Sequence, residues 1–359
     1  MHRFGRGVNS RGKGRLLAAS SWANGLRVAG KRAPRVSPSG RGPSARAVLL
    51  PVGVPWGTGA SHVAGPSTGD AMDLIVETDL GRDPDDFFAL LYLVAAGVRI
   101  RAITLSPGDK DQVAVARFLC RELGLDIPIG SAGPEREKSS VGSVHVDLLK
   151  KYQWPSRQPA DGLGQDVLRE TMARYPEAEW FIIGPLQNVG GYLAGDAPRL
   201  PRRATMQGGF VGYHLHAPSV RLEKFEGRES VATFNLNGDV KSAQRFLAHD
   251  IPRRFVGKNV CHTMVYDRDI LRRHREHPPR SRAMELFLEA MAMYLARSLE
   301  KMFHDPTAAV CLLHPEVGTW LEGELFREKG GWGTRPGGRD AMLVELQREA
   351  VWNHIFTGT

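Results

Sequence analysis

The stretch DLIVETDLGRDPDDFFALLYLVAAGVRIRAITL, residues 73–105, decides the fold. A short apolar run at 74–76 enters an acidic loop, and a longer apolar run at 87–96 follows that loop. The segment Arg99–Leu105 is again strand-like. A strand, a helix and a second strand in this order, with apolar strands, are typical of a unit whose two strands lie parallel in one sheet.

The same alternation continues along the chain. Further strands are expected at 127–129, 180–183, 205–206, 254–256 and 342–345. Further helices are expected at 113–122, from 185 to about 193, at 239–247, 282–303 and 306–313, and after the last strand. This pattern predicts an α/β protein with a single doubly wound, mostly parallel, Rossmann-like sheet and helices on both faces. Ligands of such sheets bind beyond the carboxyl ends of the strands.

Charge is divided unevenly along the chain. The 359 residues include 48 Lys and Arg against 39 Asp and Glu, a formal net charge of +9. Residues 1–71 hold eleven of the basic residues and one acidic residue, so residues 72–359 hold 37 basic and 38 acidic residues. We therefore expect 72–359 to form one domain without a nucleic-acid partner.

Residues 1–71 contain 13 Gly and 6 Pro, with Ser and Arg between them, and no apolar periodicity. Such a segment buries too little surface to offset its ordering entropy, so it is expected to be a disordered tail. Three interpretations stay open: an organelle transit peptide, a nucleic-acid-binding arm, or a segment absent from the mature protein, which would then begin at Met72.

The composition also bears on location. The longest apolar run, Phe87–Val98, is too short to span a bilayer, so no membrane partner is expected. The three cysteines at 120, 261 and 311 form neither a disulfide framework nor a spaced metal cluster. This pattern favours a reducing compartment. We expect a cytoplasmic protein, organellar only if the tail is a transit peptide.

The loop after the first strand carries five carboxylates in ten residues: Glu77, Asp79, Asp83, Asp85 and Asp86. Crowded carboxylates repel one another unless a cation neutralises them. Hard oxygen ligands without nearby Cys or His indicate Ca²⁺ or Mg²⁺ rather than Zn²⁺. Negative charge at a helix start explains one or two of these acids, but not all five.

This loop resembles the Asp-x-Asp-x-Gly…Asp-Asp pattern of the inosine–uridine-preferring nucleoside hydrolases. Four further segments match that family in the right order: Gly-Pro-Leu-Gln-Asn at 184–188, Met-Gln-Gly-Gly at 206–209, Phe-Asn-Leu-Asn-Gly-Asp at 234–239 and His-Asp-Pro-Thr-Ala at 304–308. The resemblance covers about residues 73–315. It implies hydrolysis of the N-glycosidic bond of a ribonucleoside at a bound Ca²⁺, in a homo-oligomer, commonly a dimer or a tetramer.

The resemblance also implies a role for individual residues. Asp79 would bind the metal and act as general base on a metal-bound water. The other implied metal ligands are Asp86, Asp305 and the main-chain carbonyl of Ile183. His304 is a candidate proton donor or hydrogen-bond partner for the leaving base. Substrate contacts are expected from Asp85, Asp109, Thr233 and Asn235.

Some positions depart from the family pattern. Thr233 stands where the family has a ribose-binding Glu, and Asp109 follows Gly108 where the family usually has Asn. The acidic loop is two residues longer than in the commonest members, with Asp83 as an extra acid. Trp332 is expected either to stack on a base from a loop or to pack in the core. The substrate is therefore expected to be a nucleoside or another N-riboside, with the base unspecified.

Two other functions fit parts of the sequence. A Mg²⁺-dependent phosphatase of the haloacid-dehalogenase type would need an Asp nucleophile two residues before a second Asp, and Glu77 occupies that position. A non-catalytic, Ca²⁺-dependent nucleoside- or ribose-binding protein would accommodate the departures at Thr233 and Asp109. Both remain alternatives to the hydrolase at this point.

Overall fold

The computed structural model describes residues 72–359, so the predictions for residues 1–71 lie outside it. Its strands are β1 (Asp73–Thr78), β2 (Arg99–Leu105), β3 (Ile129–Ser131), β4 (Gly162–Leu163), β5 (Glu179–Ile182), β6 (Ala204–Gln207), β7 (Ser230–Val231), β8 (Arg253–Val256), β9 (Val265–Asp267), β10 (Glu300–Met302), β11 (Gly318–Glu328), β12 (Gly331–Pro336) and β13 (Asp340–Leu346). Within the described residues, eleven of these strands form one sheet in the order β4-β3-β2-β1-β5-β6-β8-β13-β11-β12-β7, and β9 pairs with β10.

The helices are α1 (Asp85–Ala95), α2 (Lys110–Leu123), α3 (Ser143–Lys151), α4 (Gly164–Arg174), α5 (Gln187–Tyr192), α6 (Phe234–Gly238), α7 (Val240–Ala248), α8 (Lys258–Cys261), α9 (Arg268–Arg275), α10 (Arg282–Leu295), α11 (Asp305–Leu313) and α12 (Arg348–Thr357). Short 3₁₀ turns occur at Tyr213–Leu215, Pro218–Val220, Glu223–Phe225 and Pro315–Val317. None of the helices in residues 72–359 is long and apolar enough to cross a membrane.

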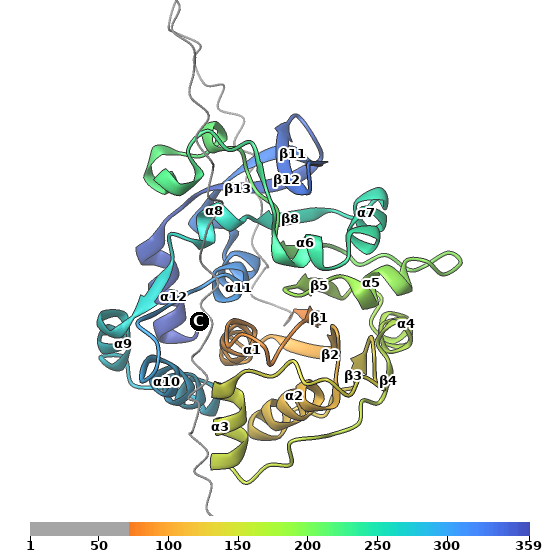
Figure 1. Cartoon of the computed structure of the whole chain (residues 1–359), viewed down its shortest axis with the longest axis vertical. Coiled ribbons are helices and arrows are strands. Elements are labelled where there is room, and N and C mark those ends of the chain that lie inside the picture. Colours follow the sequence, from red (N-terminus) through yellow and green to blue (C-terminus); the bar gives the residue numbers. More distant parts are fainter. Residues whose placement is uncertain (1–71) are drawn as a thin grey trace, which may run out of the picture. The chain divides into compact units, whose positions relative to one another are not determined.

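The first eight strands in this order, from β4 at one edge to β13, pair in parallel. The last three, β11, β12 and β7, add an antiparallel edge. Figure 1 shows helices on both faces of this sheet. In β1, Leu74 and Val76 belong to an apolar cluster with α1, α2, α10, α11 and α12, whereas Ile75 belongs to a cluster with α4, α5 and α7. Successive strand residues face opposite sides, so a continuous apolar run fits a strand covered on both faces. The predicted doubly wound α/β fold is confirmed.

The predicted elements differ from the structure at several places: α3, α4 and α9 are not predicted, and two further differences lie in the C-terminal part. The helix expected at 282–303 ends at Leu295, and the residues that follow lead into β10. The sequence predicts one strand in the C-terminal region, but this region forms three, because β11 and β12 make a hairpin beside β13. Trp332 lies on β12 and is 2% exposed, so it packs in the core and does not line the pocket described below.

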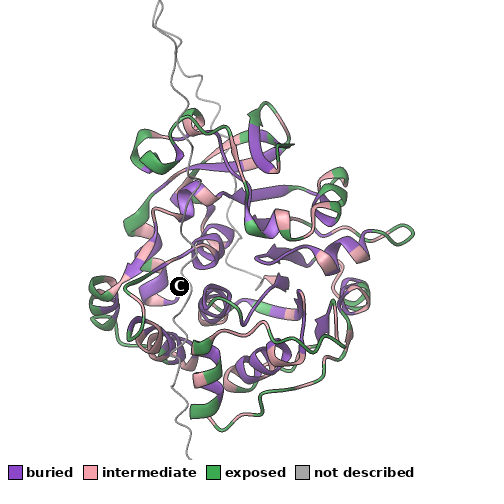
Figure 2. Ribbon diagram, in the orientation of Figure 1, coloured by how far each residue is buried: buried purple, intermediate pink, exposed green. Residues whose placement is uncertain are grey.

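The order of the strands determines the edge of the sheet at which a ligand can bind. After β1 the chain builds β2, β3 and β4 on one side, and then returns to place β5 on the other side of β1. This reversal opens a crevice at the carboxyl ends of β1 and β5. The acidic loop follows β1 and Ile183 follows β5, so both predicted parts of the site lie at this crevice. Figure 2 shows that the central strands are buried, whereas exposed residues gather on the outer helices and loops.

Candidate active site

The acidic loop is held in place by hydrogen bonds to buried groups. Gln112 of α2 donates through Nε2 to the carbonyl oxygens of Asp79 and Leu80, at 3.0 Å each. Thr78 accepts a hydrogen bond from the Leu80 amide at 3.0 Å and donates to the Asp86 carboxylate. Gly81 turns the chain at φ +111°, a conformation that other residues rarely adopt. The loop carboxylates are therefore attached to a fixed backbone.

Asp109 has a supporting position instead of the expected place in the pocket. Its carboxylate caps α2 by accepting from the amides of Asp111 and Gln112, at 3.0 and 3.1 Å, and it also accepts from the Ser140 amide at 2.8 Å. It does not line the pocket. A side chain that caps a helix start is directed back at the backbone amides. The prediction that Asp109 contacts substrate is not supported by this geometry.

Gly184 allows the ends of β1 and β5 to approach each other closely. A Cβ atom at this position would lie 2.5 Å from the Asp79 amide nitrogen, which no side chain could tolerate. The Ile183 amide donates to the Glu77 carbonyl at 2.8 Å, and Ile183 lines the pocket. The glycine in the Gly-Pro-Leu segment thus brings Ile183 next to the acidic loop.

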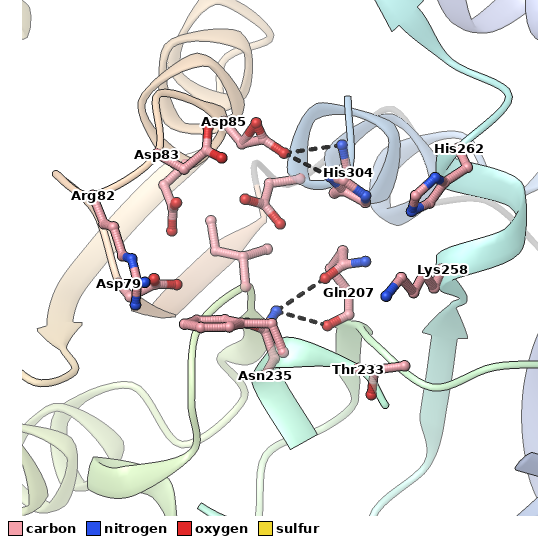
Figure 3. Close-up of a pocket in the computed structure, with 14 residues that line it drawn as sticks. Asp79, Arg82, Asp83, Asp85, Gln207, Thr233, Asn235, Lys258, His262 and His304 are labelled. Atoms are coloured by element: carbon pink, nitrogen blue, oxygen red, sulfur yellow. Dashed lines mark hydrogen bonds and ion pairs between the residues drawn. The ribbon is translucent and has the colours of Figure 1, made fainter. Parts of the chain in front are cut away.

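A pocket of about 530 Å³ opens at this crevice (Figure 3). Eight of the nine predicted site residues line it, all except Asp109: Asp79, Asp85, Asp86, Ile183, Thr233, Asn235, His304 and Asp305. The other lining residues are Arg82, Asp83, Gln207, Phe234, Lys258 and His262. The fold therefore brings together side chains that are more than 200 residues apart in the sequence.

Three buried carboxylates face this pocket, two from the acidic segment 77–86 and one from the start of α11. Burial raises the pKa of Asp79 to about 7, against the opposing effect of Arg82 and with repulsion from Asp83 and Asp85. Burial and the neighbouring carboxylates also raise the pKa values of Asp86 and Asp305 well above the ordinary value. The side chains repel one another when all are ionised. A cation bound between these carboxylates would neutralise this concentration of negative charge.

Asp85 differs from these three because it has cationic partners. Burial alone would raise its pKa, but Lys301 and His304 lower it to about 2. Lys301 lies 2.6 Å from Asp85 Oδ1 and 2.8 Å from Asp83 Oδ1. The His304 amide donates to Asp85 Oδ2 at 3.0 Å, and its ring Nδ1 lies 3.2 Å from the same oxygen. Asp85 therefore stays ionised and oriented, and its second oxygen fixes the start of α11.

The opposite wall of the pocket carries positive and neutral polar groups. In Figure 3, Gln207, Thr233 and Lys258 lie across the pocket from the carboxylates. Lys258 donates to the Ala232 carbonyl at 3.2 Å. Asn235 donates through Nδ2 to the carbonyl and the side-chain oxygen of Gln207, at 3.0 Å each. The pocket therefore has two chemically different sides.

His262 links this wall to His304. Its ring centroid lies 5.1 Å from that of His304, nearly edge-on, and its Nδ1 lies 2.6 Å from Lys224 Nζ. Burial lowers its pKa to about 3, and His304 and the nearby lysines contribute to the shift. His262 is therefore neutral at physiological pH.

The donor set suits a hard divalent cation. Asp79, Asp86, Asp305 and the Ile183 carbonyl are all oxygen donors at one pocket, the chemistry that Ca²⁺ and Mg²⁺ prefer. As the side chains stand, no group of three or more His, Cys, Asp or Glu within residues 72–359 converges as a ready-made metal cluster. The mutual repulsion described above is nevertheless relieved when a cation lies between these carboxylates, so the residues fit such an ion.

Several residues of the site have no motif that marks them in the sequence. Lys301 falls in the segment expected to be helical, although it stands only four positions before Asp305. Lys258 is the first residue of α8 and His262 follows its last residue, and this helix is too short for a periodic pattern. Gln207 does carry a signal, because it lies within the Met-Gln-Gly-Gly segment, one of the four that match the family pattern.

The chain is similar to known proteins over most of its length. The family model for inosine-uridine preferring nucleoside hydrolases matches residues 74–349. An uncharacterized protein of Aquifex aeolicus (strain VF5) is 26% identical over 286 residues, 75% of this chain and 93% of that protein. A solved plant nucleoside hydrolase has a TM-score of 0.63 at 18% identity, covering 80% of this chain and 99% of that one. The solved inosine-uridine preferring nucleoside hydrolase from Bacillus anthracis has a TM-score of 0.59 at 14% identity, with 80% and 99% covered.

At these identities the two solved structures support the fold, and the family model supports the family. The matched segment, 74–349, contains every residue that lines the pocket. The chain therefore belongs to the inosine-uridine preferring nucleoside hydrolase family, a family of N-glycosyl hydrolases.

Proposed function

We propose that this chain hydrolyses the N-glycosidic bond of a ribonucleoside or a related N-riboside, to free base and ribose, with Ca²⁺ as its cofactor. The observation that carries this proposal is the meeting of Asp79, Asp86 and Asp305, buried and mutually repelling, at one pocket. We assign the metal to these three carboxylates and the Ile183 carbonyl. Bound there, Ca²⁺ would polarise the attacking water and anchor the ribose hydroxyls.

Asp79 is the proposed general base. Its raised pKa of about 7 reflects burial among carboxylates. A carboxylate within hydrogen-bond reach of the attacking water can accept its proton, and Asp79 lines the pocket together with the other proposed metal ligands. The neighbouring carboxylates would also stabilise the positive charge that develops on the ribosyl ring as the bond breaks.

The other pocket residues are assigned to substrate. Ionised Asp85 would accept from a ribose hydroxyl, and Asn235 and Thr233 would contact the sugar from the opposite wall. His304 would donate a proton or a hydrogen bond to the departing base, from a ring that Asp85 orients at 3.2 Å. His262 packs against that ring and limits its movement.

The phosphatase alternative loses support from the position of Glu77. The residue is 2% exposed, and its carboxylate accepts hydrogen bonds from Ser106 at 2.7 Å and from the side-chain amide of Asn188 at 3.1 and 3.2 Å. It does not line the pocket, so it is not positioned as a nucleophile. The other alternative, a non-catalytic binding protein, is distinguished from a hydrolase by the assay that follows.

A panel of nucleosides tests the proposal. Purified protein is incubated with inosine, guanosine, adenosine, uridine and cytidine, with Ca²⁺ and with a chelator, and both free base and reducing sugar are measured. We expect equal amounts of base and ribose from at least one nucleoside, only with the metal present. Tight Ca²⁺-dependent binding without ribose release would identify a binding protein instead.

The oligomeric state is a separate expectation. The resemblance to the family implies a dimer or a tetramer, and light scattering after size-exclusion chromatography measures it directly.

A further inference from the structure

The wall opposite the carboxylates carries cations that lack carboxylate partners. Within residues 72–359, neither Lys258 nor Lys224 forms an ion pair with an Asp or Glu, whereas Lys301 on the acidic side forms two. The hydrogen-bond partners of Lys258 and Lys224 are neutral: the Ala232 carbonyl and the His262 ring. Burial lowers the pKa of Lys258, and Lys224 adds to the effect. An ammonium group held there would be stabilised by an anion.

Thr233 supplies a second, independent observation. The residue is 3% exposed, yet within the described residues its Oγ1 has no hydrogen-bond partner, and Thr233 lines the pocket. Buried hydroxyl groups are nearly always hydrogen-bonded, so an unpaired one at a pocket wall is suited to a ligand atom. Thr233 directly follows Ala232, which Lys258 contacts. Thr233 and Lys258 therefore belong to the same wall of the pocket, one with an unpaired hydroxyl group and the other with an ammonium group.

The charges at the pocket also favour an anionic ligand once the metal is present. Five carboxylates line it, at 79, 83, 85, 86 and 305, and four cations lie on it or directly beside it, Arg82, Lys224, Lys258 and Lys301. The balance is one net negative charge. A divalent cation among the carboxylates would reverse the sign. A site with a net positive charge attracts an anion better than a neutral sugar.

We propose that the preferred substrate is an N-riboside that carries a 5′-phosphate, with the phosphate bound by Lys258 and Thr233. This inference rests on the proposed function. The carboxylate side takes the vicinal ribose hydroxyls, and C1′ carries the bond to be broken. The exocyclic 5′ carbon is then the remaining position of the ribose from which an anionic group can extend to the opposite wall. Hydrolysis would release the base and ribose 5-phosphate, with water supplying the hydroxyl on C1′ and the proton for the base.

Direct binding tests the inference without turnover. Ribose 5-phosphate and ribose are titrated calorimetrically into the Ca²⁺-loaded protein, with inorganic phosphate as a third ligand. We expect ribose 5-phosphate to bind at least tenfold more tightly than ribose, in line with one charge-assisted contact. The difference should shrink in 0.5 M salt, because screening weakens exposed charge pairs. Equal affinity for the two sugars would overturn the inference.

Paired substrates give the kinetic test. Values of kcat/KM are measured for inosine against inosine 5′-monophosphate and for uridine against uridine 5′-monophosphate, with Ca²⁺. In Lys258→Met, the ratio of kcat/KM for the phosphorylated over the unphosphorylated member should fall about tenfold, and Lys258→Arg should restore most of it. The matched control Lys150→Met removes an exposed lysine of α3 that does not line the pocket, and it should keep the ratio.

The outcomes separate this inference from the proposed function. Release of base from nucleosides but not from their 5′-monophosphates would overturn the phosphate assignment and leave the hydrolase intact. An unchanged ratio in Lys258→Met would overturn the role of Lys258. Release of base from neither class would remove the proposed hydrolase, while the calorimetric comparison would still decide whether the wall binds phosphate.

Discussion

Asp79 and Asp85 show how two carboxyl groups six positions apart acquire opposite properties. Both are buried, but Asp79 lies among other acids while Asp85 lies against Lys301 and His304. The pKa of the first rises to about 7 and that of the second falls to about 2. The surroundings of each carboxyl group, rather than its residue type, thus suit Asp79 to accept a proton and Asp85 to remain a fixed negative charge.

Replacement of Asp79 by Asn should abolish most turnover without unfolding the protein. The amide keeps the size of the side chain but cannot take a proton, and loss of a general base lowers kcat about a thousandfold. The measurement is reducing-sugar release with Ca²⁺. Asp126→Asn, at an exposed position outside the pocket, is the control. Wild-type turnover in the Asp79 variant would contradict the assigned role.

Replacement of Lys301 by Met should lower stability. The lysine side chain is 6% exposed and its Asp85 partner 4%, so the change leaves a buried carboxylate with less compensation. Removing one member of such a pair costs about 3 kcal/mol of unfolding free energy. Urea unfolding measures the loss, with Lys150→Met as the surface control. A midpoint equal to that of the wild type would show that Lys301 is not needed to balance Asp85.

For single residues of the site, the sequence predicts the acidic side chains better than the basic ones. The carboxylates stand together in one loop or in a motif, so their crowding can be read from the order of the residues alone. Lys258 begins the short helix α8 and lines the pocket, whereas Lys301 lies on the short strand β10 and reaches Asp85 through tertiary packing. Such contacts depend on tertiary arrangement, which spacing along the chain does not encode.

Among the elements, β1, β2 and α5 are tied together by the Glu77 carboxylate. It accepts from Thr104 and Ser106 of the β2 segment and from the backbone and side-chain amides of Asn188 in α5. The ends of β1 and β5 carry Asp79 and Ile183, so this network also fixes the distance between the two halves of the site.

Replacement of Glu77 by Ala should destabilise the protein by about 3 kcal/mol, because it leaves buried hydroxyl and amide groups without a partner. Denaturant unfolding followed by circular dichroism gives the value. Glu77→Gln keeps the volume and one acceptor oxygen and should lose clearly less. Equal losses in the two variants would indicate that volume, and not hydrogen bonding, is what Glu77 contributes.

The elements differ in how readily sequence predicts them. The bounds expected for β2 are those observed, Arg99–Leu105, because its apolar residues are buried in the sheet and the turn-forming residues Ser-Pro-Gly at 106–108 end it. β11 escapes prediction because most of its residues are exposed or half-exposed and several are charged, and β12 because it contains Gly331, Gly333 and Pro336, which are uncommon in strands. The helix expected at 282–303 is too long because apolar Met302 and Phe303 continue its pattern, although the chain has already turned into β10.

For the whole molecule, the buried acids make stability depend on pH and on metal. The folded pKa values of Asp79 and Glu77 are raised to about 7 from ordinary values of 3.8 and 4.5. A raised pKa favours the folded state while the group is protonated, and this contribution is lost as pH rises through the folded pKa. Asp85 has a lowered pKa, so its effect changes only below about pH 4.

The thermal midpoint of the metal-free protein should therefore fall between about pH 4 and about pH 7.5. Addition of Ca²⁺ should raise it at the higher pH by about 5 °C or more, because a ligand that binds the folded state stabilises it. The effect should be smaller near pH 5, where protons compete for the carboxylates. Differential scanning calorimetry at both pH values checks this. A midpoint that rises with pH in the chelated protein would contradict the buried-acid account.

The cysteines, all unpaired and buried, have a practical consequence. Cys120, Cys261 and Cys311 belong to the same apolar cluster on one face of the sheet, and burial raises the thiol pKa of Cys120 and Cys311 to about 12. A thiol reagent can reach them only when this layer opens. The rate of thiol labelling in native buffer therefore measures how often the helices of this cluster separate from the sheet. Calcium should slow that rate, since Asp305 and Cys311 lie on the same helix, α11.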